Sequence, residues 1–337
     1  MTATAIEWTQ RVWNPVAGCQ IVSPGCTNCY AMKMAHRLAA MGQARYAGLT
    51  RVVNGKPVWT GEVRPVPEAL LLPLTVRKPT TWFVNSMTDL FAGSMPLDYI
   101  EQVFAVMALT PHHTYQVLTK RPAAMAAFLN GLSPDEIEAG MPFDAGDGLR
   151  DAMVEGAAQR IYADRHPGED PSLWLAVSFP LKNVILGCSV EDQVRADERR
   201  SPMAELADAG WATFVSYEPA LGAVDWTGWE FLRGLISGGE SGPGARPSHP
   251  DWHRAARDFC AHHGIPFFFK QWGAWAPRET WQPGRAMQLA VRRDGRMVPD
   301  DVAPQDVGGQ RFVLVGKGKA GRILDGRTHD ARPELIR

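Results

Sequence analysis

The sequence lacks the features that would assign it to several common classes of protein. No run of about eighteen apolar residues is present, so we expect no membrane span. The first residues hold no basic stretch followed by an apolar one, so no secretory signal is predicted. Neither sign of charge is in excess, and the net charge of -1 gives no global electrostatic case for nucleic-acid binding.

Cysteine is also scarce, and its distribution argues against a disulfide scaffold. Three of the five cysteines lie close together as C-x6-C-x2-C, at Cys19, Cys26 and Cys29. An odd number of clustered cysteines is typical of a reducing compartment, so we predict a cytoplasmic protein. Three thiols in one loop indicate a metal centre with an open coordination position. Structural zinc and an iron–sulfur cluster both remain open at this point.

Short apolar runs rich in β-forming residues are abundant, and each ends in a polar or glycine-rich cluster before a helical pattern begins. Six runs follow a first strand within about residues 7–18: Thr81–Val84, Thr114–Leu118, Asn183–Cys188, Ala212–Val215, Gly234–Ile236 and Ile265–Phe269. Continuous apolar strands that alternate with helices are typical of a parallel sheet covered by helices. We therefore predict an α/β fold with a parallel βα barrel, partial and similar to (β/α)6.

Three segments interrupt this alternation of strands and helices. Asn54-Gly55 between two short apolar runs predicts a hairpin over about residues 50–63. Residues 131–175 are rich in acidic residues and predict a helical insertion with a solvated face. From residue 278 to 337 we expect a small appendage with a hairpin around Arg293-Asp294-Gly295 and a basic stretch after it. The barrel would then occupy residues 1–277.

The polar clusters after the strands are the candidate ligand-binding residues, because parallel strands put their C-terminal ends on one face. The candidates are Asn85, Ser86, Asp89, Lys120, Ser189, Glu191, Glu218, Gly238, Gly239, Glu240 and Lys270. For any one Ser, Asn or Asp, helix capping is an equal alternative. Lys120 and Lys270 could hold a cofactor carboxylate or a substrate phosphate. Cys188 also ends a strand, and for it a buried apolar role is favoured.

Several motifs together carry a resemblance to a known family. They are Trp13-Asn14-Pro15, Gly18 to Ala31, Thr119-Lys120-Arg121-Pro122, Gly187 to Glu191, Gly238 to Pro243 and Lys270-Gln271-Trp272-Gly273. The chain resembles radical S-adenosylmethionine (SAM) enzymes, and more closely the phage-associated Gp37/Gp68 proteins with a three-cysteine motif, of the DUF5131 type. The resemblance covers nearly the whole chain.

The resemblance implies a [4Fe-4S] cluster held by Cys19, Cys26 and Cys29, with SAM bound to the fourth iron and cleaved to methionine and a 5′-deoxyadenosyl radical. Six residues lie between the first two cysteines where the superfamily usually has three, and Asn28 replaces an aromatic residue. Tyr30 is then the candidate contact for adenine, and Cys188 could donate a hydrogen atom to a product radical. Gly238-Gly239-Glu240 resembles the element that binds the cofactor's amino group, but Asn85, Ser86 and Asp89 hold the usual position for that role.

These observations predict a radical SAM enzyme that takes electrons from a protein of the flavodoxin or ferredoxin type. The implied phage association points to a nucleic acid or a nucleotide as substrate, for modification or repair. The alternative is a non-catalytic protein that binds nucleic acid or a partner and uses the same cysteines for a structural site. That site would be an iron–sulfur centre, or zinc completed by a residue such as His36.

Overall fold

The computed structural model of the chain describes residues 4, 6–132, 150–277, 288–291, 297–299 and 310–335. Its centre is a parallel sheet of seven strands, which pair in the order in which they follow along the chain. The strands are β1 (Arg11–Trp13), β6 (Thr81–Val84), β7 (Thr114–Thr119), β8 (Val184–Ser189), β9 (Ala212–Tyr217), β10 (Leu235–Gly238) and β11 (Phe267–Gln271). The sheet curls into a half-barrel, with β1 and β11 at its two edges. The predicted α/β fold with a partial βα barrel is confirmed.

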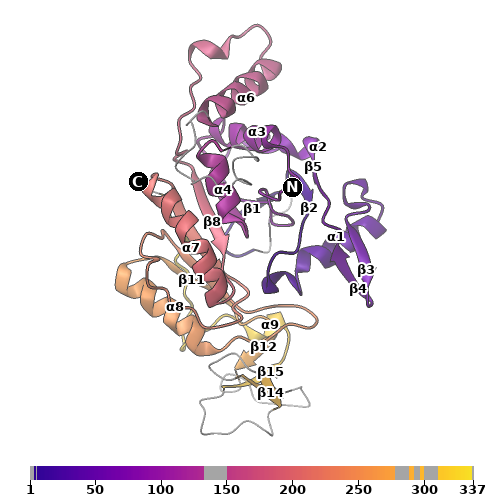
Figure 1. The fold of residues 1–337 in the computed structure, drawn as a ribbon, viewed down its shortest axis with the longest axis vertical. Helices are drawn as coiled ribbons and strands as arrows, with labels where there is room; N and C mark the ends of the chain where they lie inside the picture. Colours follow the sequence, from indigo (N-terminus) through magenta and orange to yellow (C-terminus); the bar gives the residue numbers. More distant parts are fainter. Residues whose placement is uncertain are drawn as a thin grey trace.

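Helices cover the outer face of this sheet (Figure 1). The described helices are α1 (Tyr30–Ala40), α2 (Pro67–Leu70), α3 (Leu97–Ala108), α4 (Pro122–Leu129), α6 (Arg150–Arg165), α7 (Gln193–Asp208), α8 (Pro250–His263) and α9 (Lys317–Ala320). Helix α7 packs on β8 and β9, and α8 packs on β10 and β11. Each of these two helices connects the two strands on which it packs, as the alternating sequence pattern predicts.

The two faces of the sheet belong to separate clusters of buried side chains. On β8, Leu186 and Cys188 join the large core beneath the helices. Ile185, which points the other way, joins a smaller cluster with Phe214 and Trp8. Because successive side chains in a strand alternate between faces, this smaller cluster fills the concave side of the half-barrel.

Gly187 is required by the packing of that concave side. A Cβ atom at this position would overlap the ring of Phe214 on the neighbouring strand. We expect Gly187→Ala to lower the free energy of unfolding by about 1–3 kcal/mol, because extra volume in a packed core forces side chains off their preferred rotamers. Urea denaturation measures it, with Gly93→Ala as control, since a Cβ there meets nothing. Equal effects of the two substitutions would contradict this account.

The first predicted strand is interrupted. Asn14 and Pro15 separate β1 from β2 (Val16–Gly18), since proline cannot donate to a strand ladder. Strand β2 pairs antiparallel with β5 (Val63–Pro65), outside the main sheet. The predicted hairpin is present as β3 (Thr50–Val53) and β4 (Lys56–Trp59), which pair around Asn54-Gly55. Both turn residues have positive φ, as a two-residue hairpin turn requires.

The predicted insertion and appendage are described in part. Helix α6 lies within the insertion and packs against α3, and residues 133–149 lie outside the described residues. The C-terminal part forms an antiparallel sheet in the order β12-β15-β13-β14. Its strands are β12 (Trp275–Pro277), β13 (Gln288–Val291), β14 (Met297–Pro299) and β15 (Gln310–Leu314). Strands β13 and β14 pair as the predicted hairpin requires, although its turn is outside the described residues. The division of the chain after residue 277 stays a prediction.

The segment after α9 returns to the main sheet. The Phe269 N–H donates to the carbonyl of His329, so this segment covers the edge of β11. Further along, the Glu334 N–H donates to the Arg233 carbonyl. None of the described helices combines the length and the apolar character that a membrane crossing needs.

Candidate metal and cofactor site

The cysteine loop begins where β2 ends. Cys19 follows Gly18, Cys26 closes a short 3-10 helix over Pro24–Cys26, and Cys29 is the N-cap of α1. The Cys29 thiol makes no capping hydrogen bond, although the backbone N–H groups of Met32 and Ala31 act to lower its pKa. None of the three cysteines forms a disulfide. The loop therefore places Cys29 at the positive end of α1, which favours a thiolate and other negative charge there.

The three thiols interact with one another electrostatically. The pKa of Cys19 is raised to about 12, mostly by burial and then by Asp89, with smaller contributions from Cys29 and Cys26, and Arg121 opposes this rise. Burial also raises the pKa of Cys29, against the helix N–H groups and Lys120. The thiols of Cys19 and Cys29 therefore hold their protons at neutral pH, and a metal that binds them would have to displace those protons.

The structure brings the thiols together without arranging them as ligands of a single ion. Among the described residues, no group of three or more His, Cys, Asp or Glu side chains has a geometry that could hold a metal ion. His36 is the candidate fourth ligand of the alternative zinc site. Its Nδ1 lies 3.1 Å from the hydroxyl of Thr50 on β3. In donor type the loop fits a cluster, because three thiolates on three different irons need not meet at one point.

Glu191 fastens the cysteine loop to the end of β8. Its fully buried carboxylate accepts a hydrogen bond from Ser23 (2.6 Å) and pairs with Lys120 (3.1 Å) and Arg199 (2.9 Å). Burial raises the pKa of Glu191, but the two cations and Ser23 outweigh it and hold the pKa below its usual value. A Cβ on Gly25 would overlap this carboxylate, so the loop can approach it only with glycine there.

Glu240 fastens the same loop to the segment after β10. Its carboxylate accepts from the Asn28 amide (3.0 Å) and from the Arg246 guanidinium (2.6 and 2.9 Å). Arg246 also donates to the Pro24 carbonyl. Gly239 precedes Glu240, and a Cβ on it would overlap the Trp272 carbonyl. The Gly-Gly-Glu sequence therefore holds the loop in this structure, and its glutamate is occupied by Asn28 and Arg246.

Asp89 makes a third connection. One of its oxygens accepts from the Thr119 hydroxyl (2.7 Å) and the other from the Arg121 guanidinium (3.0 Å). Arg121 in turn donates to the side chain of Gln20, next to Cys19. Ser86 is also occupied, because its hydroxyl donates to Asn14 and its carbonyl accepts from the Tyr30 hydroxyl.

The remaining strand-end residues keep polar groups that could face a ligand. Lys270 pairs with Glu218 at 2.9 Å, and both are about one-sixth exposed. Glu218 also accepts from Gln271 (3.2 Å) and lies close enough to Tyr30 to raise the pKa of its hydroxyl, to which burial contributes most. Gly238 lies beside Glu218, with an added Cβ 3.2 Å from its carboxylate.

Asn85 is unlike its neighbours. It follows β6 directly, is 3% exposed and has a φ of 61°. Among the described residues, no group hydrogen-bonds either the oxygen or the nitrogen of its side-chain amide. A buried amide with both polar atoms unpaired costs about 1–3 kcal/mol for each group, so such a residue calls for an explanation.

Two candidates on β8 face opposite sides of the sheet. Cys188 packs with Leu186 in the core beneath the helices, and burial raises the pKa of its thiol to about 12. This placement favours a buried apolar role for Cys188 over hydrogen-atom donation. Ser189 is also buried and alternates to the concave side.

Sequence reasoning missed the groups that come from outside the strand ends. Ser23 and Gln20 lie inside the cysteine loop, and Arg199 comes from α7. Of these residues, only Arg199 could have been expected from the sequence, because a glutamate buried at a strand end needs cationic partners.

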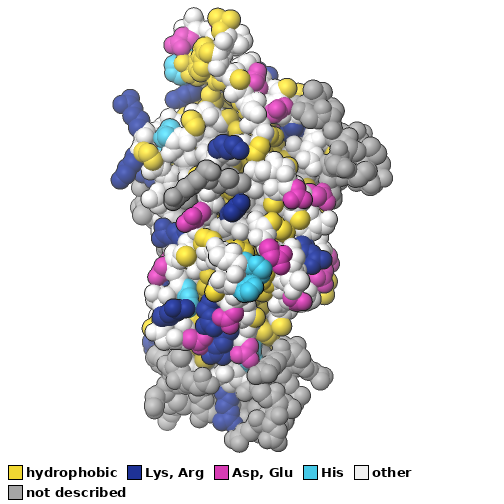
Figure 2. Space-filling model, turned by 90° about the vertical axis from the view of Figure 1, so that its left-hand side faces the viewer, with side chains coloured by type: hydrophobic (Ala, Val, Ile, Leu, Met, Phe, Trp, Pro, Cys, Tyr) yellow, Lys and Arg dark blue, Asp and Glu magenta, His cyan; other side chains and the backbone are white. Residues whose placement is uncertain are grey.

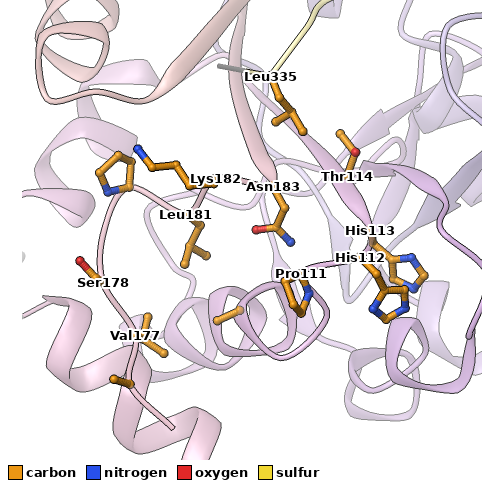
Figure 3. Close-up of a pocket in the computed structure, with 13 residues that line it drawn as sticks. Pro111, His112, His113, Thr114, Val177, Ser178, Leu181, Lys182, Asn183 and Leu335 are labelled. Atoms are coloured by element: carbon orange, nitrogen blue, oxygen red, sulfur yellow. The ribbon is translucent and has the colours of Figure 1, made fainter. Parts of the chain in front are cut away.

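A pocket of about 360 Å³ lies at the N-terminal ends of the strands, opposite the ends that carry the candidate site (Figure 3). Thr114 begins β7, Asn183 precedes β8, and both line it with Lys182 and His113. The pocket is therefore at the N-terminal edge of the sheet, away from the cysteine loop, and it does not belong to the candidate site.

Fold and site define an α/β half-barrel protein with a thiol-rich centre at the C-terminal edge of its sheet. The chain belongs to the family described as "Protein of unknown function (DUF5131)", whose model matches residues 3–333. No curated protein matches it. The narrower assignment to Gp37/Gp68 proteins stays a prediction.

Solved structures of spore photoproduct lyase resemble the fold. A complex of that lyase with dinucleoside spore photoproduct is 10% identical with a TM-score of 0.32, over 66% of this chain and 54% of that one. A mutant of the lyase is 9% identical with a TM-score of 0.37, over 91% and 68%. The chain thus spans about half the length of the first of these structures.

Proposed function

We propose that this protein is a radical SAM enzyme, with Cys19, Cys26 and Cys29 as the ligands of a [4Fe-4S] cluster. The observation that carries the proposal is the fastening of a three-cysteine loop to the C-terminal ends of β8 and β10 through Glu191 and Glu240. Parallel α/β sheets bind their ligands at this edge. Three thiols without a fourth leave one iron open to another ligand.

The groups around the loop suit a negatively charged centre. Lys120 lies near Cys26 and Cys29, and Arg121 lies near Cys19. Glu191 faces two cations, so this buried ion group has a net positive charge. Positive charge beside the thiols offsets the charge of the thiolates when a cluster binds.

When bound and reduced, such a cluster supplies one electron that cleaves SAM into methionine and a 5′-deoxyadenosyl radical. The chain's own residues bind and orient the cofactor. We assign the amino-acid end of SAM to Asn85, which has an unpaired amide donor and acceptor, and to the pair of Glu218 and Lys270. Tyr30 stays the candidate contact for adenine. Asp89, Ser86 and Glu240 position the site instead, because they are occupied by other residues of the chain.

We propose a nucleic acid or a nucleotide as substrate and a flavodoxin or ferredoxin as electron donor. The positive ion group at Glu191 would favour a phosphate-bearing substrate over a neutral one. The competing function is a binding protein in which the same thiols hold a structural metal.

The test is to purify the protein without oxygen and to measure iron, labile sulfide, zinc and visible absorbance. The reduced protein is then incubated with SAM, and 5′-deoxyadenosine is quantified. We expect about four irons for each chain. Cys29→Ala should lose the cluster absorbance and lower product formation more than about 100-fold, because the cluster loses a thiolate ligand. Cys260→Ala is the matched control, since Cys260 is buried in α8.

Stoichiometric zinc with neither iron nor sulfide would overturn the proposal. So would a reconstituted cluster that forms no 5′-deoxyadenosine, with Cys29→Ala indistinguishable from the wild type. In either case the competing function, a binding protein with a structural metal, would stand.

A further inference from the structure

One short segment of the chain carries a large excess of positive charge. Residues 30–65, which we call the basic arm, hold six Lys or Arg and a single acidic residue, Glu62. The arm therefore has a formal charge of +5. Because the whole chain has a charge of -1, the remainder carries -6. The overall charge conceals this separation, which favours a polyanionic partner for the arm.

The basic arm is a compact projection next to the cysteine loop. It consists of α1, a 3-10 helix over Ala44–Tyr46, the β3–β4 hairpin and β5. Ala35, Leu49 and Trp59 belong to its small core, which Ala17 and Met87 from outside the arm complete. In Figure 1, α1, β3 and β4 lie on the side of the molecule opposite α7 and α8. The face on the α7 and α8 side mixes both signs of charge (Figure 2), so it lacks the arm's separation of charge.

Four cations of the basic arm are exposed: Arg37, Arg45, Arg51 and Lys56. None of them forms an ion pair with a residue in the described part of the chain. The carboxylates of the candidate site, in contrast, are each paired with a cation. The exposed cations are therefore available to an anion that comes from outside the molecule.

These cations lie on more than one side of the arm. On the hairpin, Thr50 and Trp59 pair across the strands and face α1, since Thr50 contacts His36 and Trp59 lies in the arm's core. Arg51 and Lys56 alternate with these residues and point away from α1. Arg37 is on the exposed side of α1 itself.

This distribution separates two kinds of polyanion. A folded acidic protein docks with one rigid face and would reach only some of the four cations. A flexible strand of nucleic acid can follow the arm and place phosphates against cations on both sides. Met34 (41% exposed) and Val52 (59%) add exposed apolar surface to the arm, against which bases can pack.

We propose that the basic arm binds the phosphate backbone of single-stranded or locally unpaired nucleic acid. Because α1 begins at Cys29, a strand on the arm runs beside the cysteine loop. The inference relies on the proposed function only in treating that strand as substrate. Binding itself requires neither cluster nor SAM, so it can succeed or fail independently of 5′-deoxyadenosine formation.

The experiment measures fluorescence anisotropy of a labelled 20-nucleotide single strand, and of the same sequence as duplex, over a range of salt concentrations. Four phosphate contacts predict that log K falls against log salt with a slope of about -3 for the single strand. The variant Arg37→Gln/Arg45→Gln/Arg51→Gln/Lys56→Gln should lose most of this slope and at least about tenfold in affinity at low salt. Its melting temperature should stay close to that of the wild type, since all four side chains are exposed.

The matched control is Arg77→Gln/Lys78→Gln/Arg160→Gln/Arg165→Gln, which removes the same charge from exposed positions outside the arm. It should bind as the wild type does. Equal loss in both variants, or no binding by the wild type at low salt, would overturn the proposal. It would also be overturned if the arm variant bound the strand normally but could no longer accept electrons from an acidic flavodoxin. The arm would then be the docking surface for the electron donor.

Discussion

Replacing Glu191 by alanine is expected to lower the free energy of unfolding by about 3–5 kcal/mol. Glu191 is fully buried and is the ion-pair partner of both Lys120 and Arg199, whose side chains are 19% and 6% exposed. Removing it leaves two cations next to each other with little water to solvate them. An unpaired buried charge costs more than the pair itself contributes, which is why the effect is large.

The same substitution should also loosen the cysteine loop, because Ser23 loses its hydrogen-bond acceptor. We therefore expect a lower iron content after anaerobic purification, in addition to a shift of the urea midpoint. Glu62→Ala is the matched control. Glu62 pairs with Arg64 at the surface, and its loss should cost less than about 1 kcal/mol. If the two variants lose the same stability, Glu191 does not anchor the loop as described.

The main sheet could be predicted from the sequence because its strands are buried on both faces. Runs such as Val184–Leu186 are continuously apolar, and a parallel sheet covered by helices is the arrangement that needs them. The pairing of β2 with β5 could not be predicted. These strands have three residues each and 44 residues lie between them, so no local pattern connects them.

The sequence predicted where the candidate site lies, but only part of what its residues do. The sequence put Glu191, Glu218 and Glu240 at strand ends, where the structure has them. It could not show that Glu240 is occupied by Asn28 and Arg246, because Asn28 is 212 positions away in the chain. A carboxylate that binds a ligand and one that holds a loop look alike until their partners are known.

For Asn85, the structure distinguishes between two roles that the sequence left open. Helix capping was the alternative role for a strand-end asparagine. Its amide contacts none of the described backbone N–H groups, so the capping role has no support. What remains is a buried amide with a donor and an acceptor on a residue of positive φ. An amine and a carboxylate on one carbon, as in the amino-acid end of SAM, complement that amide.

Asn85→Gly is expected to weaken SAM binding at least about tenfold while leaving the protein as stable or slightly more stable. Glycine adopts a φ of 61° without strain, and the substitution removes two buried polar atoms that lack partners. Weaker binding together with unchanged or higher stability is expected when a residue is kept for ligand binding at a cost in stability, since binding sites are not optimised for folding. Calorimetric titration of the reconstituted protein with SAM and a thermal melt measure the two effects.

Asn54→Gly is the matched control for this substitution. Asn54 also has a positive φ, 49°, but it is exposed at the tip of the β3–β4 hairpin. Glycine there should relieve the same kind of backbone strain and leave SAM affinity unchanged. Asn85→Asp separates the two halves of the amide, because a carboxylate keeps the acceptor and loses the donor. If Asn85→Gly binds SAM normally and is less stable than the wild type, Asn85 holds the fold together and is not a cofactor contact.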